Sequence, residues 1–346
     1  MRSSSIPPTR PPRVTLQDVA DAASVSKTAV SFVLNGRAGA NIPAETRERI
    51  LAAVAHLGYR PNAMARALRQ GDSSLVGFVT DEIATTPFAG QIFRGAQDTA
   101  WQHRRILTLV NTDHQNALEQ EALNTLLQHQ VGAFVLASMS HNHVQVPQAL
   151  AGLPVVLVNA SCPRGSAPSV VPDELRGGRE ATEHLLQFGH KRIGLINNLD
   201  VALAAPLRIQ GYQEALQNAG LTPDPRWVLH INGWQAAGFA GAMTLLQQSD
   251  RPTALFCLND QAAMGAIDAA RMLGLRVPED LSVIGFDDLQ LIAAHLRPAL
   301  STMRLPHYEM GQWGMQTLFS ERGEPPQQAQ LHCPLISRAS VGPAPS

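Results

Sequence analysis

The chain has 346 residues, of which 45% are hydrophobic, 16% charged and 5% aromatic. This length accommodates two or three average domains with a large buried core, which excludes small disulfide-stapled scaffolds. The composition is typical of a globular protein and excludes a disordered or fibrous one. No apolar run approaches the roughly 18 to 20 residues of a membrane span, and residues 1–13 contain no apolar segment that could serve as a signal peptide. We therefore expect a cytoplasmic protein with no membrane partner.

Charge is divided unevenly along the chain. Residues 1–71 hold 10 Lys and Arg against 4 Asp and Glu, whereas the remainder holds 17 against 24, so the net charge of -1 conceals a basic first part and an acidic body. This pattern indicates that only the first part meets a polyanion. A solvated basic tail without a partner is the alternative at this point.

Residues 1–13 are rich in Ser, Pro and Arg, and we expect a disordered basic arm there. Helical structure is predicted to start after Val14, because Thr15 and Asp18 form a capping-box pattern. Ser24 to Ser26 then interrupt the helical pattern. The apolar face of this first helix holds Leu16, Val19, Ala20 and Ala23.

A second short helix is predicted over Lys27–Leu34, with Ser26 as its cap. Two short helices joined by a tight turn are typical of a helix-turn-helix, although an ordinary helical bundle fits the same spacing. A third helix is predicted over 43–57 and should end at Gly58, so that residues 14–60 form a three-helix domain. Its apolar stripe holds Ile50, Leu51, Val54 and Leu57.

Residues 61–72 contain the segment AMARALRQ, which has a helical pattern but is too short to be stable alone. We interpret it as a hinge. From Leu75 onward, apolar runs alternate with helical stretches such as 90–103, 177–188 and 261–273, which predicts parallel sheets covered on both faces. The eight runs are LVGFV, ILTLV, AFVLA, VVLV, RIGLI, WVLHI, ALFCL and LSVIGF.

The body, residues 73–340, is thus predicted to be α/β, with two Rossmann-like parallel-sheet subdomains divided near 161–173 and joined by later crossovers. No GxGxxG, Walker A or GxSxG sequence occurs, so the usual signatures of dinucleotide, nucleoside-triphosphate and serine-hydrolase chemistry are missing. Asp287 and Asp288 lack a partnered nucleophile, and we expect no catalytic residues and no enzyme activity.

Three cysteines, Cys162, Cys257 and Cys333, lie far apart and form no CxxC pair, so we expect reduced thiols. His141 and His143 form an HxH pair in a polar stretch, but no third ligand stands near them. The sequence predicts neither a metal site nor a cofactor.

The segment VTLQDVADAASVSKTAVSFVLNG, followed by ETRERILAAVAHLGYRPNAMARAL, closely resembles the LacI/GalR family of bacterial transcriptional regulators. In the second half, GHKRIGLI, RIQGYQEAL and PALSTMRLP resemble the same family and, by shared fold, periplasmic sugar-binding proteins. The resemblance covers roughly residues 14–340. It implies a helix-turn-helix domain followed by a periplasmic-binding-protein-like body. It also implies a sequence-specific DNA-binding regulator, with a repressor as the first expectation.

The resemblance implies that Lys27–Leu34 is the recognition helix, with Lys27 and Thr28 as base readers. Phe32 departs from the arginine common in the family, and because phenylalanine cannot donate a hydrogen bond, the operator sequence cannot be transferred from relatives. Leu68 matches the leucine that is wedged into the minor groove. Residues that match phosphate-contacting positions are Thr15, Ser26, Ser31 and Asn35.

Ligands of open α/β sheets bind at the carboxyl ends of strands, and in a two-lobed body these ends face one another across a cleft. A structural role competes with ligand binding for each candidate there. The candidates that follow strands are Phe88, Asn159, Asn259 and Asp287, and the family motifs add Arg208 and Trp234.

Aromatic, amide and carboxylate groups suit a sugar as the small-molecule effector, with a purine or nucleoside as the alternative. A homodimer on a near-palindromic double-stranded operator is implied by the resemblance. A sugar-binding transport protein would fit the body fold but not the N-terminal pattern. The last residues, VGPAPS, form no heptad tail, so a coiled-coil tetramer is not expected.

Overall fold

The computed structural model describes residues 14–34, 42–59, 73–86, 89–162, 165–198, 203–232, 234–320 and 328–345. The chain divides between Ser73 and Ser74 into two units. The predicted arm, residues 1–13, and the predicted hinge, residues 61–72, lie outside the described residues.

The first unit contains three helices, α1 (Leu16–Ala22), α2 (Lys27–Leu34) and α3 (Ala44–Leu57). The predicted capping box is present, since the Thr15 hydroxyl accepts a hydrogen bond from the Asp18 amide while the Asp18 carboxylate accepts one from the Thr15 amide. These bonds satisfy amides at the start of α1 that have no partner within the helix. The predicted helical domain is therefore confirmed.

The three helices share a small apolar core. One prediction about it is wrong, because Leu51 is 48% exposed. Leu51 lies about 100° around the helix from Ile50, outside the stripe that faces α1 and α2, and Ala53 lies on that stripe instead. The buried members of the core are Val19, Ala20, Ala23, Val30, Val33 and Ile50.

The second unit contains two six-stranded sheets with the strand orders β11-β5-β4-β3-β1-β2 and β12-β10-β9-β8-β6-β7. Every strand pair is parallel except β10 with β12. The first sheet is formed by β1 (Leu75–Thr80), β2 (Ile106–Asn111), β3 (Phe134–His143), β4 (Val155–Ser161), β5 (Ser169–Pro172) and β11 (Gln328–Leu331). The second is formed by β6 (Ile193–Asn198), β7 (Val228–Ile231), β8 (Ala254–Cys257), β9 (Ser282–Asp287), β10 (Ser301–Arg304) and β12 (Leu335–Ile336).

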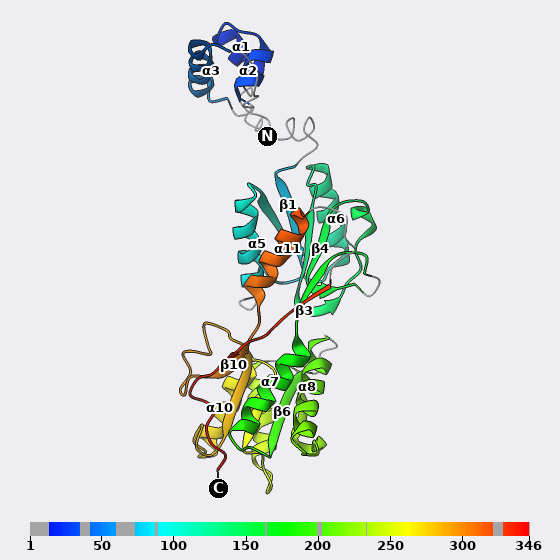
Figure 1. The fold of residues 1–346 in the computed structure, drawn as a ribbon, viewed down its shortest axis with the longest axis vertical. Helices are drawn as coiled ribbons and strands as arrows, with labels where there is room; N and C mark the ends of the chain where they lie inside the picture. The colour runs from blue at the N-terminus through cyan, green and yellow to red at the C-terminus, as the bar shows by residue number, and fades with distance from the viewer. Residues whose placement is uncertain are drawn as a thin grey trace, which may run out of the picture. The chain divides into compact units, whose positions relative to one another are not determined.

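Helices cover both faces of each sheet (Figure 1). The helices α5 (Gly90–Gln102) and α11 (His307–Phe319) pack on one face of the first sheet, and α6 (Asn116–Gln128) packs on the other. On the second sheet, one face is covered by α7 (Glu174–Gln187) and α8 (Ala204–Asn218), and the other by α9 (Gln235–Leu246) and α10 (Asp260–Met272). Short 3-10 helices lie at Gln148–Leu150 and Pro225–Trp227.

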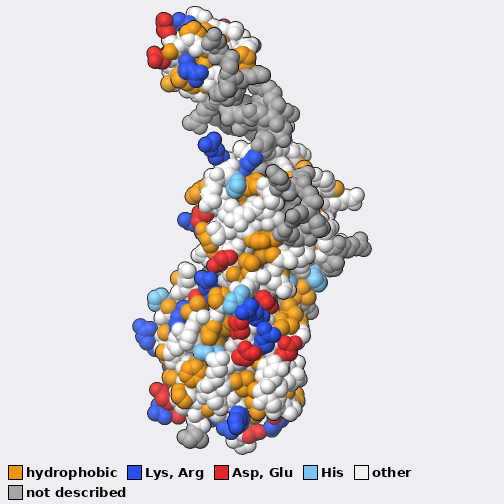
Figure 2. Space-filling model, viewed as in Figure 1, with side chains coloured by type: hydrophobic (Ala, Val, Ile, Leu, Met, Phe, Trp, Pro, Cys, Tyr) orange, Lys and Arg blue, Asp and Glu red, His pale blue; other side chains and the backbone are white. Residues whose placement is uncertain are grey.

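The α/β class with two parallel-sheet subdomains is confirmed, and each of the eight predicted apolar runs forms a strand. The chain first leaves the first sheet after β5, returns to it with α11 and β11, and ends in the second sheet with β12. In Figure 2, charged side chains gather over the half of this unit that contains the second sheet, whereas the visible face of the other half carries fewer of them.

Paired helices approach closely at glycines. A Cβ added at Gly311 of α11 would lie 2.0 Å from the Ile92 carbonyl oxygen of α5, and one added at Gly95 would lie 2.0 Å from the Tyr308 carbonyl oxygen. Both distances are far below a van der Waals contact, so this crossing requires glycine. Equivalent approaches join α7 with α8 at Gly178 and Gly211, and α9 with α10 at Gly238 and Gly265.

Replacing Gly311 with alanine should therefore destabilise the second unit by about 1 to 3 kcal/mol through overpacking. Gly90→Ala is the matched control, because a Cβ there meets no atom within 4 Å. Urea denaturation followed by circular dichroism measures both changes. Equal midpoints for the two variants would contradict the close-packing interpretation.

Candidate nucleic-acid and ligand sites

The start of α2 presents polar side chains to solvent. The Ser26 hydroxyl accepts a hydrogen bond from the Ala29 amide at 3.2 Å, so the cap predicted for this helix is present. Lys27 and Thr28 in the next turn are exposed, while Val30 on the opposite face is fully buried. The apolar core thus holds α2 in place and leaves the side chains of its first turn exposed to solvent.

The remaining candidates of the first unit differ in their surroundings. Ser31 and Phe32 are half-buried. The Thr15 hydroxyl is exposed and donates to the Asp18 carboxylate at 2.8 Å, so its amide and hydroxyl both serve the cap. Asn35 and Leu68 lie outside the described residues, as does Phe88 of the second unit.

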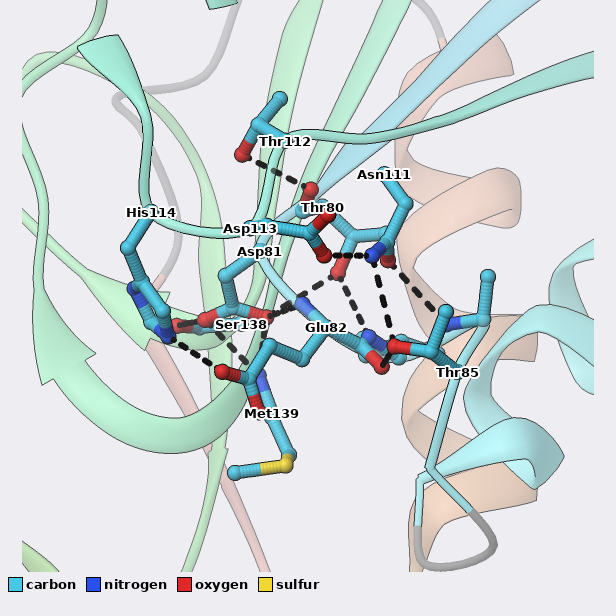
Figure 3. A network of polar contacts seen from close by, with 12 residues as sticks. Thr80, Asp81, Glu82, Thr85, Asn111, Thr112, Asp113, His114, Ser138 and Met139 are labelled. Atoms are coloured by element: carbon cyan, nitrogen blue, oxygen red, sulfur yellow. Dashed lines mark hydrogen bonds and ion pairs between the residues drawn. The ribbon is translucent and has the colours of Figure 1, made fainter.

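A polar network occupies the carboxyl ends of β1 and β2 and the middle of β3 (Figure 3). The Asp81 carboxylate directly follows β1 and accepts hydrogen bonds from the Ser138 hydroxyl at 2.6 Å, the Met139 amide at 2.9 Å and the Glu82 amide at 2.6 Å. These bonds tie the end of β1 to the middle of β3. Since its oxygens are already engaged, Asp81 stabilises this edge of the sheet.

Asn159 lies at the same edge, in β4. Its backbone adopts φ +54°, and its side-chain amide donates to the carbonyl oxygens of Ser138 at 3.0 Å and Met139 at 2.9 Å. The register between β3 and β4 shifts in this stretch, and the amide of Asn159 holds the bulged segment of β3. No described residue donates a hydrogen bond to its side-chain oxygen, which remains a candidate acceptor.

The carboxyl ends of β8 and β9 carry the second group of candidates, centred on Arg208. Its Nε donates to Glu174 Oε2 at 2.6 Å, and both side chains are buried, with 9% and 2% of their surfaces exposed. Its Nη1 donates to the Leu258 carbonyl oxygen, and its Cζ lies 3.6 Å from the centroid of the Phe286 ring. Arg208 is thereby fixed by α7, β9 and the residue that follows β8.

Electrostatics at this position favour a buried, compensated charge. Burial opposes the charged form of Arg208, but the charge and the hydrogen bond of Glu174 and the nearby charge of Asp287 act together against it, and the pKa of the guanidinium is raised. Burial raises the pKa of Asp287 well above its usual value, and Arg208 opposes this shift.

Two neighbouring carboxylates have structural partners. Burial raises the pKa of Asp260 to about 7, and its carboxylate accepts hydrogen bonds from the Leu289 amide and the Thr302 hydroxyl, each at 2.6 Å. Asp288 forms an ion pair of 2.6 Å with Arg338. These contacts give both residues structural roles.

The structure brings Arg208 and Asp287 together, with Asn259 next to Leu258. Asn259 caps α10, since its side-chain oxygen accepts from the Ala262 amide at 2.8 Å. Trp234 immediately precedes α9 and is 49% exposed. These positions leave the ligand roles of all four residues as predictions.

Sequence reasoning missed Asp81 and Glu174, and it considered His141 only as part of an HxH pair. The signal for Asp81 is its place directly after the strand LVGFVT, the same criterion that selects Asn259. Glu174 carries no local signal, because it meets Arg208 only after the chain has folded.

No group of three or more His, Cys, Asp or Glu within the described ranges could hold a metal ion. The three cysteines are buried free thiols. Among the described helices, none combines the length and the apolar character needed to cross a lipid bilayer.

Comparisons with known proteins agree with this geometry. The family described as "Bacterial regulatory proteins, lacI family" matches residues 15–62, and "Periplasmic binding proteins and sugar binding domain of LacI family" matches residues 73–339. The ribose operon repressor of Haemophilus influenzae is 33% identical over 312 residues, covering 90% of this chain and 92% of the relative.

Two solved structures are similar as well. The lac repressor dimer bound to operator and the anti-inducer ONPF has a TM-score of 0.82 at 28% identity and covers 96% of this chain and 100% of that one. A LacI family regulator of Enterococcus faecium with bound ribose has a TM-score of 0.64 at 26% identity and covers 78% of this chain and 99% of that one.

Removing one partner of the buried pair should be costly. Glu174→Gln should lower the free energy of unfolding of the second unit by about 3 to 5 kcal/mol, because it leaves Arg208 buried without its carboxylate. Glu183→Gln on the same helix is the control, since its 3.8 Å pair with Arg179 is partly exposed to solvent and should contribute under about 1 kcal/mol. Chemical denaturation measures the free energy of unfolding of both variants. Comparable losses of stability in Glu174→Gln and Glu183→Gln would argue against a special role of the buried pair.

Proposed function

The chain belongs to the LacI family of bacterial regulatory proteins, and we propose that it is a sequence-specific transcriptional repressor whose operator affinity is set by a small molecule bound in its second unit. The observation that carries the proposal is the combination, in one chain, of a capped helix with an exposed polar first turn and a two-sheet body with polar groups at its strand ends. We propose no catalytic activity.

In the proposed DNA complex, α2 lies in the major groove. Lys27 donates to guanine O6 or N7, and Thr28 bonds a base edge or contacts a thymine methyl. Phe32 contacts a thymine methyl or a sugar edge in place of the arginine of relatives. Phosphate contacts that set the register come from Thr15, Ser26, Ser31 and Asn35, and Leu68 is the minor-groove wedge.

The assembly we propose is a homodimer on a near-palindromic operator, because two symmetric subunits place two recognition helices on two half-sites. The dimeric lac repressor bound to operator, which is similar over 96% of this chain, supports this arrangement. Because a repressor must reach chromosomal DNA, we propose that the protein works in the cytoplasm.

The effector we propose is a sugar. Asp287 and Arg208 bind its hydroxyls, with Asn259 and Asn159 as further hydrogen-bonding groups. Trp234 and Phe88 pack on its C–H faces. The ribose seen in the Enterococcus faecium relative supports this class of ligand. A purine or nucleoside is the alternative, since a flat base would use the same aromatic groups.

Coupling requires that the ligand bind two arrangements of the body with different affinities. Closure of the two halves on the ligand would alter the spacing of the two hinge segments in a dimer, and operator affinity would change accordingly.

A binding assay tests both partners. The full chain is titrated onto the DNA upstream of its own gene, with and without neutral sugars and nucleosides. We expect tight binding that weakens steeply with salt and that one compound shifts. Equal affinity for every DNA sequence would contradict the proposal.

Thr28→Ala should relax specificity at one operator position by about 1 to 3 kcal/mol, because it removes one base contact. Thr46→Ala on α3 is the control and should leave specificity unchanged. Competition assays with single-base operator variants measure the effect. Unaltered discrimination by Thr28→Ala would show that this side chain does not read a base.

Asp287→Asn should weaken effector binding roughly ten-fold or more while leaving operator affinity without effector unchanged. Glu279→Gln, which changes an exposed carboxylate just before β9, is its control. Arg208 is unsuited to this test, because its removal leaves Glu174 buried and unpaired. An unaltered effector response of Asp287→Asn, measured by calorimetry and DNA binding, would contradict its ligand role.

A further inference from the structure

His141 is a buried histidine whose ring atom Nδ1 has no hydrogen-bond partner among the described residues. It lies near the end of β3 and is 6% exposed. A buried polar atom without a hydrogen bond destabilises a fold relative to one that is satisfied. Because no described residue offsets this cost at His141, a bound molecule is a candidate partner for Nδ1.

The position of His141 is fixed from both halves of the second unit. Its carbonyl oxygen accepts a hydrogen bond from the Leu203 amide at 3.0 Å, directly before α8, the helix that carries Arg208. In Figure 1, β3 runs to the junction of the two sheets. The imidazole is close enough to Glu174 and Arg208 for their charges to act on it.

The surrounding charges are already compensated. Burial lowers the pKa of His141, and of the nearby charges Glu174 raises it while His143 and Arg208 lower it. The imidazole is therefore neutral near pH 7. The positive charge of Arg208 is matched by Glu174 at 2.6 Å, so these groups offer no uncompensated cation to a phosphate.

The neighbouring histidine does not share this environment. His143 is exposed, and its Nδ1 lies 2.9 Å from the Ser161 hydroxyl. The HxH pair therefore does not form a chelating site, and His141 is available for a different role.

We infer that His141 reads the effector, donating or accepting one hydrogen bond through Nδ1, and that the effector is an uncharged, hydroxyl-bearing molecule without a phosphate group. This inference rests on the proposed function, because it assigns a specificity-determining residue and a ligand class to the same cleft. In a neutral imidazole, a protonated Nδ1 donates a hydrogen bond to a hydroxyl or carbonyl oxygen, whereas an unprotonated Nδ1 accepts one from a hydroxyl group.

The ligand class is tested by calorimetry on the full chain with matched probes. The neutral probes are D-ribose, cellobiose, adenosine and cytidine, and the charged probes are ribose 5-phosphate, AMP and CMP. We expect at least one neutral probe to bind and its phosphate ester to bind at least ten-fold more weakly. Tighter binding of an ester, or binding of no neutral probe, overturns the inference.

The role of His141 is tested with variants on the neutral probe that binds. His141→Leu should raise its Kd about ten-fold without lowering the thermal midpoint, because leucine removes the unsatisfied atom at similar volume. His141→Asn, which keeps a polar group near the place of Nδ1, should restore most of the affinity. His143→Leu is the control and should bind normally.

A merely structural histidine gives the opposite result, in which His141→Leu lowers the thermal midpoint and leaves the Kd unchanged. Operator binding without ligand is measured in parallel. If it is absent while the neutral probe binds through His141, the proposed regulation fails and the ligand assignment stands. If operator binding is present and no neutral probe binds, the ligand assignment alone fails.

Discussion

The second unit depends on one buried ion pair. Arg208 and Glu174 meet at 2.6 Å with almost no exposed surface, and the same guanidinium binds the Leu258 carbonyl and stacks on Phe286. Two charges removed from water are tolerated only when they are paired and hydrogen-bonded. This constraint joins α7, α8 and the ends of β8 and β9. It also contributes to the electrostatic environment of Asp287 and His141, two residues of the proposed ligand site.

The close packing of helices also fixes the positions of the strand ends. Pairs of glycines let α5 approach α11, α7 approach α8 and α9 approach α10 until backbone meets backbone. Packed in this way, the helices hold the strands in register, so the polar residues that follow the strands lie at defined positions. At the first sheet, the Asp81 network holds the bulge of β3 beside Asn159, and the same strand continues to His141.

Sequence reasoning predicted the parts of the fold that depend on local pattern. Each of the eight apolar runs forms a strand, although β2 and β7 are only partly buried, and Thr15, Ser26 and Gly58 mark helix ends as expected. The strands β5, β10 and β11 mix polar with apolar residues and β12 has only two residues, so they form no continuous apolar run that sequence reasoning could detect. Leu51 is apolar yet exposed, because composition alone does not fix the face of a helix.

The candidate site was predictable only where its residues follow strands or match family motifs. Arg208 and Asp287 were found in this way, but their partner Glu174 is separated from Arg208 by 34 residues and carries no pattern. His141 was noticed as half of an HxH pair, whereas its significance comes from burial, which no sequence pattern reports.

The central claim is that binding of the effector to this protein changes its affinity for the operator. Linkage requires reciprocity, so the factor by which the effector changes operator affinity must equal the factor by which operator DNA changes effector affinity. The most direct measurement is therefore the Kd of the effector on the full chain, with and without saturating operator. The account predicts a difference of about 5-fold to 150-fold that matches the shift in operator affinity. An effector Kd that is identical in the two titrations would contradict it.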